Sequence, residues 1–316
     1  MFPHLVVVLA VIVIAALFLP LFFYITNKAA FLQKPGTLVI RQNGSRWLGT
    51  PLTSGTMARE DLPFAQISEA VYHVAEAVAK NETAAVEASS TEDQPSGIDG
   101  WVRWGSFFAA SVQAKFSKHN LRVEICENAA LQRVVVAFGG TNAKNIQDWI
   151  ANLRWFIPHH DDEYTLVVKE LGRLFANELV SRCASGKSVS GAMLFATGHS
   201  LGGGLAQEFA YSLPQAPAIQ RVSKVYAFDA SPVTGFFSVK KSLRDVNRKG
   251  LAIDRIYERR EILAITRSII NLIHPPGANN PQIREIRYNF KEKWNPIYRH
   301  SISRLISFLQ ETAQGA

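Results

Sequence analysis

The sequence predicts an α/β protein with a mostly parallel central sheet and helices on both faces, preceded by one N-terminal transmembrane helix. Two observations carry this prediction. After residue 160, helix and strand patterns alternate along the chain, and such alternation is typical of parallel sheets. Near the N-terminus, an apolar run of 21 residues is long enough to cross a membrane.

The apolar run extends from Leu5 to Ile25 and contains no charged residue. At about 1.5 Å per residue it spans a bilayer core of roughly 30 Å. A cleaved signal peptide fits less well, because no Lys or Arg precedes the run and no small-residue cleavage site follows it. Because Lys28, Lys34, Arg41 and Arg46 follow the run, the positive-inside tendency places the rest of the chain on the cytoplasmic side.

We therefore expect a transmembrane anchor over residues 1–28, a linker over 29–60 and one α/β domain over 61–316. Turn signals such as Pro35-Gly36 and Asn43-Gly44 favour the linker. The expected elements of the domain are helices over 61–79, 163–182, 201–211 and 300–309, a hairpin of strands over 121–126 and 132–138, and strands over 191–197, 222–228 and 251–257.

Composition narrows the possible functions. The formal charge is +8, and residues 240–300 account for all of it with 14 Lys or Arg against 6 Asp or Glu. A basic face of this kind suits anionic lipid, whereas no recognised nucleic-acid module accompanies the charge. Cys126 and Cys183 are the only cysteines, so we expect neither a disulfide framework nor a cysteine metal site.

The pentapeptide Gly198-His199-Ser200-Leu201-Gly202 has the Gly-x-Ser-x-Gly pattern of a nucleophile elbow. In such an elbow the serine stands on a strained turn between a strand and a helix, and the glycines relieve crowding of the backbone. The apolar segment before it and the helical pattern after it supply that context. The motif therefore predicts the α/β-hydrolase fold, with Ser200 as the nucleophile.

A serine hydroxyl needs a base, and the base needs a carboxylate that orients it. In this fold the chain order is Ser, then Asp or Glu, then His. His300, at the start of the last helix, is the leading candidate for the base, and His274 is the other histidine after Ser200.

Three carboxylates are candidates for the acid. Glu261 lies in the turn that leaves the expected strand over 251–257, where catalytic groups gather in open α/β sheets. Asp229 directly follows the strand over 222–228 and is the alternative acid. Glu258 is the third candidate.

Around these residues the chain resembles a class 3 lipase, the fungal-lipase-like branch of the α/β-hydrolases. The resemblance rests on the elbow together with two segments upstream of it. Val134 to Thr141 is similar to the strand and turn of the family's oxyanion hole, and Asn145 to Leu153 is similar to its helical lid. The resemblance covers about Asp61 to Gln310.

The resemblance implies further roles. It places the oxyanion-hole donors at Thr141 and at the backbone N–H of Leu201, where they would stabilise the charge that forms on the ester carbonyl. It makes Trp149, Ile150 and Leu153 the apolar face of a lid that covers the site.

The chain also departs from the family's pattern. Gly139 replaces the family's arginine, the family's Gly-Ser-Pro segment is altered at Asp229, and Glu261 replaces the usual aspartate. His159 and His160 stand next to two aspartates, but no further ligand has metal-binding spacing, so we expect no metal.

The sequence thus predicts a membrane-anchored serine hydrolase that cleaves carboxylic esters of lipids without a cofactor. Its partners would be the lipid ester substrate and the membrane. The anchor and the basic region favour bilayer lipids, including phospholipid acyl esters, alongside acylglycerols. Two alternatives stay open: a lipid acyltransferase with the same triad, and a catalytically inactive membrane-tethered binding protein.

Overall fold

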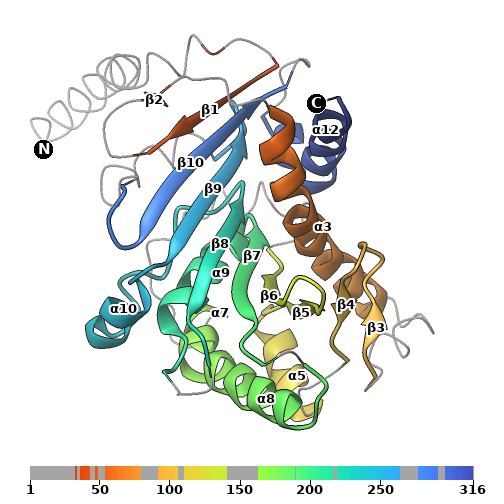
Figure 1. The fold of residues 1–316 in the computed structure, drawn as a ribbon, viewed down its shortest axis with the longest axis vertical. Helices are drawn as coiled ribbons and strands as arrows, with labels where there is room; N and C mark the ends of the chain where they lie inside the picture. Colours follow the sequence, from red (N-terminus) through yellow and green to blue (C-terminus); the bar gives the residue numbers. More distant parts are fainter. Residues whose placement is uncertain are drawn as a thin grey trace, which may run out of the picture.

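The computed structural model describes residues 33, 36–42, 47–48, 54–79, 92–105, 110–140, 163–188, 190–215, 219–263, 277–290 and 296–315. Within this part of the chain the strands form one ten-stranded sheet in the order β2-β1-β10-β9-β8-β7-β6-β5-β4-β3 (Figure 1). The α/β fold with a large central sheet that the sequence predicts is therefore confirmed.

Five neighbouring strands in the sheet run parallel. They are β6 (Arg133–Phe138), β7 (Met193–His199), β8 (Val222–Phe228), β9 (Ala252–Glu258) and β10 (Gln282–Asn289). Parallel strands place their carboxyl ends at one edge of a sheet, where ligands and catalytic groups gather. We call this the carboxyl edge; it is formed by the strand ends at Phe138, His199, Phe228 and Glu258.

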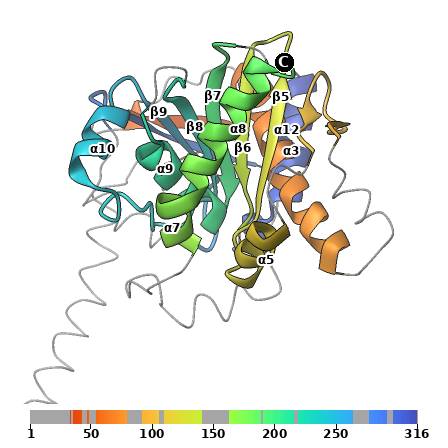
Figure 2. The same cartoon turned by 90° about the horizontal axis from the view of Figure 1, so that it is seen from below.

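Helices cover both faces of the sheet (Figure 2). On one face α3 (Ser54–Ala79) and α12 (Ile302–Gln314) pack against each other and against the sheet, in a cluster that includes Phe64, Ile67 and Leu305. The opposite face is covered by α7 (Glu163–Leu166), a π-helical turn (Val167–Leu171), α8 (Gly172–Ala184) and α9 (Leu201–Ser212). Because both faces are covered, most residues of the central strands are buried, including the charged residues Asp254 and Arg255 of β9 and Glu285 and Arg287 of β10.

The remaining elements flank this core. They are the antiparallel strands β3 (Gln94–Pro95), β4 (Val102–Arg103) and β5 (Val123–Asn128), the helices α5 (Ala110–Lys118) and α10 (Lys241–Asn247), and a 3₁₀ turn (Tyr298–His300). Both cysteines are free thiols; Cys126 is buried, and burial raises its pKa to about 12.

Part of the segment that the sequence predicts as a linker belongs to the domain. β1 (Thr37–Arg41) pairs antiparallel along β10, and β2 (Trp47–Leu48) pairs with β1. α3 begins at Ser54 and continues through Pro63, so it starts before the expected residue 61. The turn signals around residues 35 and 43 favour a linker, but the segment between them is rich in β-branched residues and forms a short strand.

Several predicted features lie outside the described residues. The expected transmembrane anchor over 1–28 is one of them, and none of the helices that the structure describes is long and apolar enough to span a membrane. The others are Thr141 of the expected oxyanion hole, the alternative base His274, and the lid residues Trp149, Ile150 and Leu153.

Candidate active site

Ser200 stands at the carboxyl edge, between the end of β7 and the start of α9. Its φ of 58° and ψ of −124° lie in a region that residues with a side chain rarely adopt, so the turn is strained. The neighbouring strand holds this conformation, because the Ser200 N–H donates to the carbonyl oxygen of Phe228 at 2.9 Å. The Ser200 carbonyl oxygen in turn accepts from the N–H of Ser231 at 2.9 Å.

The elbow leaves no room for side chains beside the serine. A Cβ on Gly198 would lie 2.3 Å from the carbonyl oxygen of Gly202, and a Cβ on Gly202 would lie 2.2 Å from that of Phe138. Such distances are far below van der Waals contact. The pentapeptide therefore needs both of its glycines, for the reason that the motif predicts.

The structure brings Ser200, His300 and Glu261 together in one hydrogen-bonded chain. The Ser200 Oγ lies 3.0 Å from the His300 Nε2, and the His300 Nδ1 lies 3.0 Å from the Glu261 Oε2. Because a carboxylate only accepts hydrogen bonds, Nδ1 carries a proton and Nε2 is free to accept the serine hydroxyl. All three side chains are buried. This arrangement can remove the proton from the serine as it attacks.

Glu261 reaches His300 through the turn that follows β9. Arg260 has a φ of 65°, which reverses the chain direction just before Glu261. The Ile262 N–H donates to the carbonyl oxygen of Pro296 at 3.1 Å, and this bond ties the turn to the segment that leads to His300. The Glu261 Oε2 also accepts the Leu263 N–H at 2.8 Å, so the carboxylate is held on two sides.

The two other candidate acids lie close by but have other principal contacts. The Asp229 Oδ1 accepts the Glu258 N–H at 3.3 Å, and its Oδ2 lies 4.0 Å from the His199 Nε2. The carboxylate of Glu258 pairs with the guanidinium groups of Arg299 and Arg304. The geometry therefore favours Glu261 as the partner of His300.

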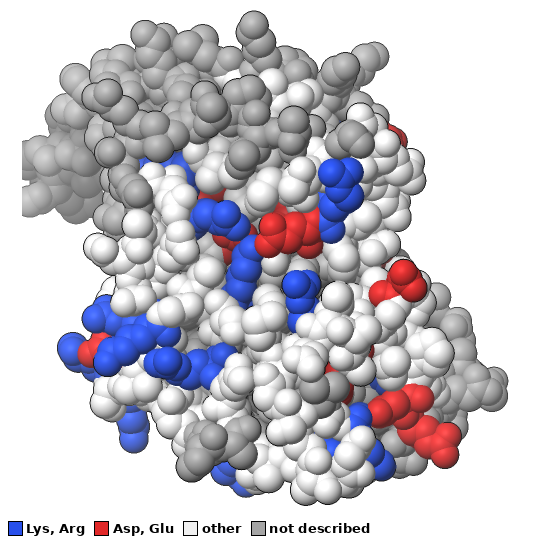
Figure 3. All heavy atoms as spheres, in the orientation of Figure 1, with Lys and Arg blue, Asp and Glu red and all other residues white. Residues whose placement is uncertain are grey.

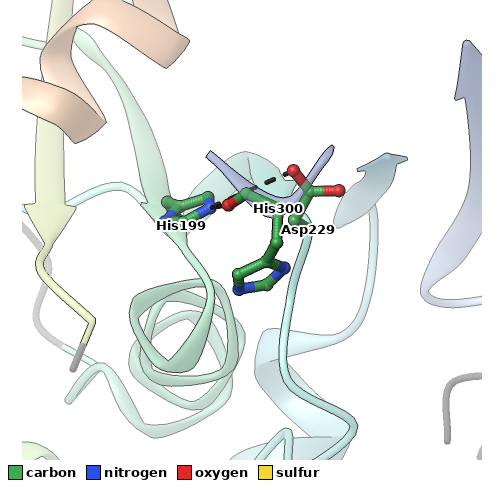
Figure 4. A group of neighbouring side chains, drawn as sticks. All are labelled: His199, Asp229 and His300. Atoms are coloured by element: carbon green, nitrogen blue, oxygen red, sulfur yellow. Dashed lines mark hydrogen bonds and ion pairs between the residues drawn. The ribbon is translucent and has the colours of Figure 1, made fainter. Parts of the chain in front are cut away.

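His199 and Tyr72 form a second hydrogen-bonded chain that the sequence analysis did not find. The His199 Nε2 lies 2.8 Å from the carbonyl oxygen of His300 (Figure 4). The His199 Nδ1 lies 3.1 Å from the Tyr72 hydroxyl. Because a carbonyl only accepts, Nε2 carries the proton and Nδ1 accepts from Tyr72. The Tyr72 oxygen accepts the Gly140 N–H at 3.0 Å, and burial raises the pKa of Tyr72, which keeps its proton in place.

The turn after β6 lies against the start of α9. A Cβ on Gly140 would lie 3.2 Å from the Leu201 nitrogen and 2.7 Å from the carbonyl oxygen of His199. Leu201 is the first residue of α9, so its N–H has no acceptor within the helix and is available to a ligand. A Cβ on Gly139 would lie 3.0 Å from the Arg122 Cβ and 3.0 Å from the Val71 Cγ1, so a larger residue there would require both neighbours to move by a few tenths of an ångström.

His199, Asp229 and His300 also bring three possible metal ligands within 4.8 Å of one another (Figure 4). Both ring nitrogens of His300 are engaged, one by Ser200 and one by Glu261. A metal ion bound by His300 would have to displace Ser200 or Glu261 from one of these ring nitrogens. The cluster is therefore better explained as part of the serine site.

The basic residues that the structure describes between 240 and 300 do not form a single face. Lys240, Lys241 and Lys249 are exposed around α10, where Figure 3 shows Lys and Arg gathered at the lower left. Asn247 of α10 donates to the carbonyl oxygens of Tyr211 and Leu213, at the end of α9 remote from Ser200. The α10 residues therefore lie at the sheet edge opposite the carboxyl edge.

Two other arginines stand next to the site, in the turn that carries Glu261. Arg260 is exposed, and Arg259 is partly buried. Burial, followed by the positive charges of neighbouring arginines, lowers the pKa of Arg259 to about 10. Arg259 therefore stays protonated at neutral pH.

Comparison with known proteins finds a similarity to a phospholipase-like family over part of the chain. Residues 64–218 match a phospholipase-like family model, the Tle-like phospholipase domain. The matched range contains Ser200 and ends before Glu261 and His300. A search of curated protein sequences gave no match. The resemblance to the fungal-lipase-like family that the sequence indicates is confirmed.

The chain is also similar to solved fungal lipase structures. These include the Rhizomucor miehei lipase propeptide complex (13% identity, 71% of this chain and 64% of that chain, TM-score 0.43). They also include lipase from Rhizopus microsporus var. chinensis (15% identity, 72% and 71%, TM-score 0.42) and lipase II from Rhizopus niveus (12% identity, 73% and 78%, TM-score 0.42). The match spans less than two thirds of the Rhizomucor miehei chain.

Proposed function

We propose that this chain, which resembles the fungal-lipase-like family, is a membrane-anchored serine hydrolase that cleaves carboxylic esters of lipids. The observation that carries the proposal is the buried chain from Ser200 through His300 to Glu261, with both links at 3.0 Å. The serine stands on a strained elbow at the carboxyl edge, where a substrate carbonyl can approach its oxygen.

The reaction follows from these contacts. His300 Nε2 takes the Ser200 proton as Oγ attacks the ester carbonyl, and the N–H of Leu201 stabilises the negative charge on the carbonyl oxygen. His300 then gives that proton to the departing alcohol, which leaves an acyl group on Ser200. Water, deprotonated by His300, attacks the acyl-enzyme, and His300 returns the proton to the Ser200 Oγ as the fatty acid leaves. Glu261 keeps His300 in the required tautomer throughout.

Three features support a lipid substrate, and in particular a phospholipid acyl ester. The matched family model is a phospholipase domain. The residues that resemble a lid would cover the site with an apolar surface, and Arg259 and Arg260 stand in the turn next to Glu261, where they can attract an anionic headgroup. Acylglycerols stay within the proposal, because the triad acts only on the ester.

The test uses the full chain in detergent and two lipid substrates: vesicles that contain phosphatidylglycerol and an emulsion of triacylglycerol. We expect fatty acid release by the wild type and a loss of about 10⁴-fold or more in Ser200→Ala. Ser212→Ala is the control, because Ser212 is a buried serine at the far end of the same helix. Equal release by wild type and Ser200→Ala would refute the proposal.

The same assay separates the alternatives. A new ester formed from an added alcohol, in place of free fatty acid, would indicate acyl transfer. A folded wild type that releases nothing from either lipid would indicate a binding protein.

For the proposed cytoplasmic orientation, protease added to sealed membrane vesicles should digest the domain only from the cytoplasmic face.

A further inference from the structure

Glu258 is a buried carboxylate that the proposed reaction does not use. It is the last residue of β9, and only 1% of its surface is exposed. Its Oε1 pairs with Arg299, and its Oε2 lies 3.2 Å from the Nε of Arg304. Both arginines are themselves buried. Three buried charges in contact are costly to separate, because removal of one leaves the others unpaired.

The two arginines stand on either side of His300 in the chain. Arg299 directly precedes it in the 3₁₀ turn, and Arg304 lies in the first turn of α12. The Arg304 N–H also bonds to the hydroxyl of Ser301, which caps that helix. Contacts from Glu258 to both arginines therefore hold the chain before and after His300.

Glu258 also belongs to the turn that carries Glu261. Arg299 donates to the carbonyl oxygen of Arg259, the next residue after Glu258, at 3.1 Å. The Glu258 N–H donates to the Asp229 Oδ1. The residue is thus tied to β8 through its backbone and to the segment around His300 through its side chain.

From this geometry we propose that Glu258 is a positioning residue, which holds the turn of Glu261 and the segment of His300 at the separation that the triad needs. The proposal rests on the proposed function. Hydrogen bonds to a catalytic base must be kept within about 0.5 Å, and a displacement of about 1 Å can cost roughly 10²-fold in rate. Glu258 does this through Arg299 and Arg304, without contact with the substrate.

The test compares two buried glutamates that each pair with arginine. Glu258→Gln removes the charge between Arg299 and Arg304. Glu285→Gln is the matched control, because Glu285 is also buried and lies 3.5 Å from Arg41, on strand β10 rather than beside His300. Each variant removes the charge of a buried glutamate that contacts arginine, so a loss of stability is expected in both.

We expect kcat for a water-soluble p-nitrophenyl ester to fall about 10- to 100-fold in Glu258→Gln, with KM changed less than about 3-fold. Glu285→Gln should keep its kcat. The low-field proton resonance of the His300 Nδ1–H should shift or broaden in Glu258→Gln and stay unchanged in Glu285→Gln, because this signal reports the bond to Glu261 directly.

Two further variants keep the proposal testable if Glu258→Gln does not fold. Glu258→Asp keeps the charge, so we expect it to retain more activity than any neutral variant that folds. Arg299→Lys keeps a positive charge but cannot bond as a planar guanidinium to both Glu258 and the Arg259 carbonyl, so it should lower kcat and shift the same resonance.

An unchanged His300 resonance and kcat in folded Glu258→Gln, or in Arg299→Lys where that variant alone folds, would overturn the positioning role. So would equal losses of kcat in Glu258→Gln and Glu285→Gln. A wild type that hydrolyses no ester would refute the proposed function instead, while the resonance still reports whether Glu258 positions His300.

Discussion

Two carboxylate–histidine pairs lie side by side in this site, and they differ in what the histidines contact. Glu261 is 3.0 Å from His300, whereas Asp229 is 4.0 Å from His199. The ring centroids of the two histidines are only 4.9 Å apart. Proximity of an acid to a histidine therefore does not identify the catalytic pair.

The two pairs differ in what the second ring nitrogen of each histidine contacts. In His300 it contacts the hydroxyl of Ser200, so the ring can take and return a proton during the reaction. In His199 both nitrogens bond to fixed groups, the Tyr72 hydroxyl and the carbonyl oxygen of His300. The first pair is suited to catalysis, and the second holds the backbone around it.

The largest effect should follow from a change in the first pair. We expect Glu261→Gln to lower kcat on lipid vesicles by about 10³- to 10⁴-fold, because the amide no longer stabilises the protonated ring or its tautomer. Steady-state kinetics measure this, with circular dichroism to confirm the fold. A loss of less than about 10-fold would show that another carboxylate supports His300.

The second-largest effect on kcat should come from a change in the backbone around His199, which the second pair helps to hold. A Cβ in Gly140→Ala would meet the carbonyl oxygen of His199 at 2.7 Å and the Tyr72 hydroxyl at 2.6 Å. We expect kcat to fall about 10²-fold, because the turn beside the Leu201 N–H must move. Gly277→Ala is the control, since its Cβ would meet no atom within 4 Å. Equal kcat in both variants would contradict the expectation.

A change in the second carboxylate should have a smaller effect on activity. Asp229 has a φ of 41°, which asparagine tolerates, and an asparagine oxygen can still accept the Glu258 N–H. Asp229→Asn should therefore lower kcat by less than about 10-fold in the same kinetic assay. A loss as large as that of Glu261→Gln would reverse the roles of the two acids.

The smallest effect on activity is expected at Asp61, a buried carboxylate with no histidine partner among the contacts described for it. Its Oδ2 accepts the Tyr288 hydroxyl at 2.8 Å, and burial, with the charge of Asp254, raises its pKa to about 8. The folded state therefore holds a proton that the unfolded state releases near pH 4. This contribution to stability is complete below about pH 4 and is lost as the pH rises to about 8.

In Asp61→Asn the free energy of unfolding should fall less steeply as the pH rises, by at most about 1.4 kcal/mol per pH unit. The kcat of the variant at pH 7 should stay within about 2-fold of the wild-type value. Urea unfolding at pH 5 and pH 8 measures the difference. An identical pH dependence in wild type and variant would show that Asp61 is ionised in the fold. Because Asp61 belongs to neither histidine pair, the comparison also separates the pH dependence of folding stability from the pH dependence of those pairs.

The sequence predicts both residues of the first pair, but of the second pair it offers Asp229 only as an alternative acid and gives His199 no role. The order Ser200, Glu261, His300 follows from the elbow motif and from where strands end, and both are patterns along the chain. His199 and Tyr72 are 127 residues apart, and their contact depends on α3 packing over β7. No local pattern contains that information.

The strands also show that a local pattern does not reveal contacts with distant residues. β7, β8 and β9 each contain adjacent apolar residues and lie within about two residues of their expected positions. β10 was not expected, because Arg284, Glu285 and Arg287 interrupt its apolar residues. Glu285 and Arg287 are nevertheless buried, and charged residues become compatible with a buried strand only once their distant partners are known.

The most direct test of the account is to treat the folded protein with a fluorophosphonate probe and map the modified residue by mass spectrometry. We predict a single modification at Ser200, formed at a rate that falls strongly in Glu261→Gln and little in Asp229→Asn. Absence of modification in the folded wild type, or equal modification of Ser200→Ala, would contradict the central claim that Ser200 is the nucleophile activated by His300.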